Sequence, residues 1–168
     1  AIEHKDNQGN QHVIPAGDVQ RMSAGSGILH SEFNPSETEN VNFLQIWIQP
    51  KFRGITPSYE QKTVVQNGKL TPLVTPTGSD GSLSINQDAN LYRLVLDEAE
   101  EFTLTTEQNI GYIHIVKGAI TVDGEKYSEG DAFSVDANTN IALSARQNLE
   151  AIWFVLPLSD KPSALLSV

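Results

Sequence analysis

The sequence predicts an all-β protein made of two similar units in tandem, and three observations lead to this prediction. Twelve Gly and eight Pro in 168 residues indicate many turns. Short apolar runs recur between clusters of Gly, Pro, Asn and Asp, a pattern typical of a β-sandwich or barrel. The chain also matches itself, because residues 1–4 resemble residues 119–122 and Gly17-Asp18 resembles Gly130-Asp131. Since strand, hairpin and Gly-Asp turn recur in the same order, we predict two tandem β-barrels.

The individual strands are predicted from apolar runs bounded by turn residues. Residues 41–49 form the strongest run, apolar on both faces and ended by Pro50, so we predict a strand covered on both sides. Residues 54–81 contain turn dipeptides such as Asn67-Gly68 and few long apolar runs, which indicates a connector. Further strands are predicted at residues 91–96, 112–116, 120–122, 132–135 and 151–156, with a tight hairpin at Asp123-Gly124.

The repeat suggests where the domains divide. We place residues 1–56 in the first barrel, residues 57–90 in a connector that contributes strands, and residues 91–168 in the second barrel with a C-terminal tail. Residues 91–118 supply strands before the matched point of the second copy, whereas no residue precedes Ala1 in the first copy. Because a barrel without several strands has unpaired edges, we expect a missing N-terminal segment of the same protein to complete the first barrel. Strands donated by another subunit are the alternative.

Charge and composition exclude several classes of function. Eleven Lys and Arg stand against 21 Asp and Glu, which gives a net charge of −10. This charge repels phosphate groups, so we expect neither direct nucleic-acid binding nor a membrane partner. No stretch approaches the roughly 20 apolar residues of a membrane-spanning helix, which predicts a soluble, cytoplasmic protein. The chain has no Cys, so His and carboxylates would have to hold any metal.

His30-Ser31-Glu32 is the sharpest candidate for a chemical site. On a strand, residues two apart project to the same face, so His30 and Glu32 can ligate one metal ion together. Imidazole and carboxylate suit iron, manganese, nickel, copper or zinc. Two ligands are too few by themselves, however, and a hydrogen-bonded surface pair remains the alternative interpretation.

A longer pattern around this pair resembles a known motif. The second cupin motif, Gly-x5-Pro-x-Gly followed by His-x3-Asn, is matched by Gly9, Pro15, Gly17, His30 and Asn34. The amino-acid sequence of residues 17–32 looks like that of the pirin family, and the distinctive resemblance covers about residues 1–61. Beyond residue 61 the resemblance is weaker, but the matching segments follow in the same order.

The resemblance implies a fold and a ligand set. Pirins have two stacked cupin barrels with a single non-haem divalent metal, most often Fe(II), in the N-terminal barrel, and other transition metals are alternatives. Of the four protein ligands implied, two fall on His30 and Glu32, and two belong to a His-x-His motif upstream of Ala1. Each missing imidazole removes a bond, so we expect weak metal binding by this chain alone.

The second barrel is expected to bind no metal. Leu104 and Thr106 occupy the His-x-His slots there, and the position that matches His30 falls near Leu143. We also expect His114 to be a packed or hydrogen-bonded core histidine. His4 and His12 are expected at the surface.

The resemblance also implies an activity. Bacterial pirins of this type are similar to quercetin 2,3-dioxygenases, which open the central ring of a flavonol with O2 and release CO. In this interpretation the metal lowers the pKa of the flavonol hydroxyl, and Glu32 accepts the proton as the catalytic residue. Met22 and Gln45 are candidate substrate-binding walls, and simple packing is their alternative role.

Two other functions stay open at this point. The first is a non-enzymatic, iron-binding regulator, in which the state of the metal changes the surface offered to a regulatory protein partner. The net charge of −10 suits a protein partner better than DNA. The second is a metal-free bicupin fragment with a purely structural role.

Overall fold

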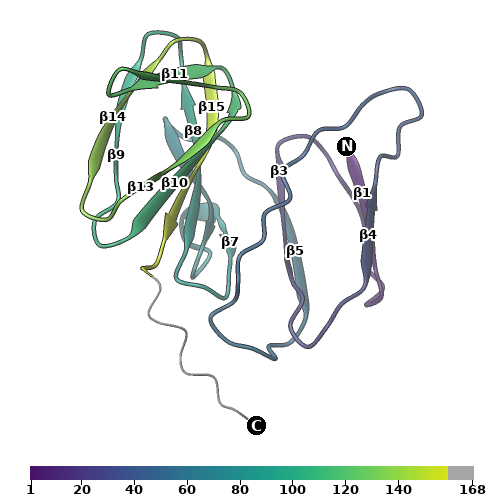
Figure 1. Cartoon of the computed structure of the whole chain (residues 1–168). Helices are drawn as coiled ribbons and strands as arrows, with labels where there is room; N and C mark the ends of the chain where they lie inside the picture. The colour runs from purple at the N-terminus through teal and green to yellow at the C-terminus, as the bar shows by residue number, and fades with distance from the viewer. Residues whose placement is uncertain (159–168) are drawn as a thin grey trace. The chain divides into compact units, whose positions relative to one another are not determined.

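The computed structural model describes residues 1–158 and shows an all-β chain, which confirms the predicted fold class (Figure 1). The chain divides into two compact units. Unit 1 contains Ala1–Val65 and Val74–Gln87, and unit 2 contains Gln66–Leu73 and the chain from Asp88 onward. The predicted connector is therefore shared between the units, and the domain boundaries given above stay a prediction. The predicted C-terminal tail lies outside the described residues.

Unit 1 consists of short strands in small sheets. The strands β2-β1-β4 form one antiparallel sheet, and β3 pairs with β5 in a second one. The elements of this unit are β1 (Ile2–Asp6), β2 (Gln11–Ile14), β3 (Asp18–Ser23), β4 (His30–Phe33), β5 (Ser58–Thr63), the 3-10 helix η1 (Ser79–Gly81) and β7 (Leu83–Ser84). In the three-stranded sheet, His4 lies opposite Glu32 on one side and opposite His12 on the other.

Unit 2 is a barrel of two larger sheets. One sheet has the strand order β13-β10-β15-β8-β6 and the other has the order β12-β11-β14-β9. Its strands are β6 (Leu70–Thr75, whose last two residues belong to unit 1), β8 (Asn90–Leu96), β9 (Glu101–Thr105), β10 (Ile110–Lys117), β11 (Ala119–Val122), β12 (Glu125–Ser128), β13 (Ala132–Val135), β14 (Asn140–Ala145) and β15 (Leu149–Leu156).

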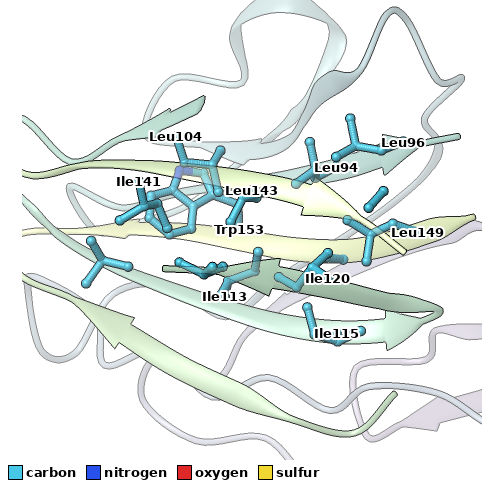
Figure 2. Packing of buried hydrophobic residues seen from close by; sticks show 14 residues of the cluster. Leu94, Leu96, Leu104, Ile113, Ile115, Ile120, Ile141, Leu143, Leu149 and Trp153 are labelled. Atoms are coloured by element: carbon cyan, nitrogen blue, oxygen red, sulfur yellow. The ribbon is translucent and has the colours of Figure 1, made fainter. Parts of the chain in front are cut away.

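An apolar core fills unit 2. Alternate residues of each strand point inward, so that Ile113 and Ile115 of β10 are completely buried. Figure 2 shows the aliphatic side chains gathered around the ring of Trp153, which is 2% exposed. The adjacent β10 carries Gly111, where a Cβ atom would lie 2.1 Å from that ring. A glycine is therefore required for the indole to reach its place in the core.

The two units repeat one local arrangement, as the internal match of the sequence predicts. In unit 1, β1 pairs with both β2 and β4, and in unit 2, β11 pairs with both β12 and β14. Gly17 and Gly130 each have φ of +89°, a conformation that favours glycine. The amide that follows each glycine donates to the carbonyl three residues earlier, at 3.2 Å for Asp18 and 2.9 Å for Asp131.

Most strand predictions are confirmed, and one is wrong. The five runs predicted in unit 2 all lie within strands, and Asp123-Gly124 joins β11 to β12 with positive φ at both residues. Residues 41–49, by contrast, form no strand, and the side chain of Trp47 is 86% exposed. A strand requires a neighbour to accept its backbone hydrogen bonds, and no strand of residues 1–158 pairs with this run.

Over the part of the chain that the structure describes, no helix is long and apolar enough to cross a bilayer.

Candidate metal centre

The two predicted ligands share one face of β4. Strand β4 lies beside β1 (Figure 1), and in this pairing His30 lies opposite Asp6 and Glu32 lies opposite His4. The side chain of Glu32 is only 13% exposed, whereas His30 is exposed. The ring of His30 stacks on that of His4, with 5.6 Å between the centroids. The pair therefore shares the face of the sheet that carries the buried His4, with Glu32 mostly covered and His30 exposed.

Polar side chains from three other segments surround Glu32. Gln20 of β3 donates its Nε2 hydrogen to Oε1 of Glu32 at 2.7 Å. Nδ1 of His4 lies 3.6 Å from the same oxygen. Nε2 of Gln45 lies 3.4 Å from Oε2, so this predicted wall residue does reach the site. Met22 is half-buried two residues after Gln20, on the same face of β3.

His4 is part of this cluster, so its prediction as a surface residue is wrong. The side chain has no exposed surface, while His12 on the next strand is exposed as expected. The ring of Tyr59 contacts both histidines, with centroids at 5.0 Å from His4 and 4.9 Å from His12. The sequence did carry a signal for His4, because Glu3 and Lys5 occupy the alternate, outward positions of the strand.

Asp6 adds a fixed negative charge beside His4. Its Oδ2 lies 3.4 Å from Nε2 of His4, and its carboxylate accepts hydrogen bonds from the amides of Gln8 and Asn10 and from the Asn10 side chain. Burial raises the pKa of Asp6, but these hydrogen bonds outweigh burial and lower its pKa to about 2. Asp6 is therefore ionised at neutral pH.

The pKa of Tyr59 reflects its burial and the negative charges around the site. Burial and then the charges of Asp6, Glu32 and Asp18 raise the pKa of Tyr59 to about 12. Its hydroxyl therefore stays protonated at neutral pH and donates to Oε1 of Gln61 at 3.0 Å. Neither Tyr59 nor Gln20 could be recognised from the sequence, because their place in the site depends on the pairing of β3 with β5.

The matching positions of unit 2 are apolar. Where His4 pairs with Glu32 in unit 1, Val122 pairs with Leu143 in unit 2. Leu143 is 1% exposed, and Ile141, which stands in the place of His30, is 8% exposed. Figure 2 shows both side chains in the apolar cluster. An apolar interior therefore suffices for this arrangement of strands, and the polar face of unit 1 has to be explained by something other than folding.

The remaining predictions for unit 2 have mixed outcomes. Leu104 is buried in the core, and Thr106 is buried with its hydroxyl donating to the carbonyl of Asp136 at 2.8 Å. His114 is half-buried and lies on the face of β10 opposite Ile113, away from the apolar cluster. The prediction of a core histidine at position 114 is therefore wrong.

The donor set fits part of a metal site. His30 and Glu32 offer an imidazole and a carboxylate on one face, and buried polar atoms without a hydrogen-bond partner lie nearby, namely Nδ1 of His4 and Oε1 of Gln20. Within residues 1–158, however, no group of three or more His, Asp or Glu side chains is placed to hold a metal ion. The assignment of His30 and Glu32 as ligands stays a prediction.

Comparison with known proteins identifies the family. The family model described as Pirin matches residues 1–48, and the model described as Quercetinase C-terminal cupin domain matches residues 72–156. A protein of Escherichia coli named quercetin 2,3-dioxygenase is 42% identical over 160 residues, which make up 93% of this chain and 68% of that protein. The chain belongs to the pirin family.

Solved structures of pirins agree with the fold. The crystal structure of YhhW from Escherichia coli matches with a TM-score of 0.89 and 39% identity, covering 94% of this chain and 68% of that one. A structure of the bacterial pirin YhhW in complex with nickel(II) matches with a TM-score of 0.87 and 40% identity, covering 94% and 69%. The prediction of a pirin with cupin barrels is thereby confirmed.

Proposed function

We propose that this pirin chain carries half of the metal centre of a dioxygenase that opens the flavonol ring of quercetin with O2 and releases CO. His30 and Glu32 are two of the protein ligands, and Fe(II) is the proposed metal. The main support is the contrast between the units, because unit 1 places His and Glu where unit 2 has buried Ile and Leu. The names of the relatives, and the nickel(II) complex of one, support a divalent metal and this class of reaction.

The remaining ligands would come from polypeptide outside these 168 residues. Two donors leave a divalent transition metal with a weak and loosely oriented site. Residues 1–158 contain no third donor grouped with His30 and Glu32, and the chain spans 68% of the length of its Escherichia coli relative. A preceding segment with a His-x-His motif supplies what is needed in this proposal. Location in the cytoplasm stays a prediction made from the sequence.

The contacts of Glu32 suggest how it acts. Gln20 donates to Oε1 at 2.7 Å and Gln45 donates to Oε2 at the longer distance of 3.4 Å, so Oε2 is the oxygen proposed to take the proton from the substrate hydroxyl. Gln45, at 3.4 Å from Oε2, and Met22, on the face of β3 that carries Gln20, are the proposed walls of the flavonol site. A divalent metal supplies Lewis acidity, which lowers the pKa of the flavonol hydroxyl and favours this proton transfer.

The proposal is tested on the complete polypeptide, loaded with Fe(II) without oxygen and then given quercetin and O2. We expect loss of quercetin together with release of CO. Glu32→Gln should abolish turnover and weaken metal binding, whereas Glu129→Gln, in an exposed turn, should change neither. Normal turnover and metal binding in Glu32→Gln would instead support a surface pair. Full metal occupancy without turnover in the wild type would favour the regulatory function.

A further inference from the structure

The imidazole of His4 is in an unusual place for a buried side chain. It has no exposed surface, although the matching position of unit 2 is filled by Val122, which needs no partner. Burying an imidazole costs free energy unless its ring nitrogens find hydrogen-bond partners. A role in packing alone would thus be served better by an aliphatic residue.

The surroundings fix the ring in one orientation. Its Nε2 lies 3.4 Å from Oδ2 of Asp6, and the rings of His30 and Tyr59 contact it at 5.6 and 5.0 Å between centroids. Asp6 is itself held by three hydrogen bonds from Gln8 and Asn10. Nδ1 is thereby directed at the carboxylate of Glu32, with Oε1 at 3.6 Å.

We propose that His4 is a positioning residue for Glu32. Its Nδ1, which has no hydrogen-bond partner in this structure, faces Oε1 at 3.6 Å from the side of β1, while Gln20 donates to the same oxygen from β3. Oε1 therefore has a neighbour on either side, and Oε2, which accepts from Gln45 at 3.4 Å, is the other oxygen of the proposed ligand. Asp6 thus fixes the imidazole of His4, and the imidazole in turn orients the carboxylate of Glu32, the proposed metal ligand. This inference rests on the proposed function of Glu32.

Three substitutions of His4 separate positioning from packing. Asn places an amide NH2 close to where Nδ1 lies, Gln places one close to Nε2 and Leu offers neither. We expect His4→Leu and His4→Gln to weaken Co(II) binding by the complete polypeptide by about 10–100-fold and to alter the visible spectrum of the bound ion. His4→Asn should stay within about threefold of wild type. His12→Asn, on the neighbouring strand, is the matched control and should bind normally.

Two results would overturn the inference. One is wild-type affinity and spectrum in His4→Leu, or in His4→Gln if the leucine variant does not fold. The other is a His4→Asn variant as weak as His4→Leu, because Nδ1 would then not be the group that matters.

A second measurement needs no metal. In a double-mutant cycle with His4→Gln and Glu32→Gln, the combined change in the unfolding equilibrium constant should differ by at least about threefold from the product of the single changes. If the change in the unfolding equilibrium constant of the double variant equals the product of the two single changes, the positioning role is overturned. Coupling in the cycle, together with a wild type that binds no Co(II), would refute the proposed function and leave the positioning role standing.

Discussion

Placing a carboxylate in unit 2 at the position that matches Glu32 tests the contrast between the units. Leu143→Glu puts that group at a site only 1% exposed, within the cluster of Ile120, Leu104 and Trp153. In unit 1 the same position is tolerated because Gln20 donates to the carboxylate. Apart from Trp153, with its single indole N–H, the buried residues of the cluster in unit 2 are aliphatic, so the new carboxyl would lack the polar partners that Glu32 has.

The cost has two parts. Loss of the buried leucine removes about 1.5–3 kcal/mol of transfer free energy. A buried polar group without a hydrogen bond adds about 1–3 kcal/mol, which gives about 3–6 kcal/mol in total. Burial also raises the pKa of the introduced carboxyl, so the cost grows as the pH rises above about 4, the usual range of Glu. Leu143→Met conserves volume and should cost less than about 1.5 kcal/mol.

Urea unfolding followed by tryptophan fluorescence measures this cost. Trp153 is buried in the same core, whereas Trp47 is 86% exposed, so the change in emission reports mainly on unit 2. Each variant is compared with wild type at the same pH, at pH 7.5 and pH 4.5. A cost below about 1 kcal/mol for Leu143→Glu at the higher pH would refute the reasoning, because a carboxylate would then need no polar partners at this position.

Three further predictions follow from the pKa values and from one close contact. One of the four tyrosines should titrate near pH 12 in the folded protein when tyrosinate absorbance is followed, and Tyr59→Phe should remove that step. A result in which all tyrosines titrate near 10 would contradict the negative potential of the site. The pKa of Asp6 is about 2 against 3.8, so its ionised form stabilises the fold at neutral pH and this stabilisation is lost as the pH falls from about 4 to 2. Asp6→Asn should therefore flatten the pH dependence of the unfolding free energy in that window, and an unchanged slope would contradict this. Gly111→Ala should destabilise unit 2 by about 1–3 kcal/mol in the same urea assay, because its Cβ meets the Trp153 ring, and wild-type stability would show that the ring can move.

The sequence alone determined the fold class and the two ligand candidates. Short apolar runs between turn residues decide in favour of strands, since alternation and turn chemistry are local properties of the chain. His30 and Glu32 could be paired from their spacing, because side chains two apart on a strand share a face whatever its neighbours are. The Asp123-Gly124 turn was predictable for the same local reason.

Tertiary structure decided which residues stand around the ligands and which runs become strands. Tyr59 and Gln20 reach the site from β5 and β3, and Gln45 reaches it from outside any strand. Such contacts depend on the pairing of segments distant in sequence, which local patterns do not encode. Residues 41–49 show the converse, because an apolar run becomes a strand only where another strand lies alongside. The burial of His4 likewise depends on its place between β2 and β4. The pairing with β4 brings Glu32 beside the ring, whereas Asp6 lies two residues further along β1 itself.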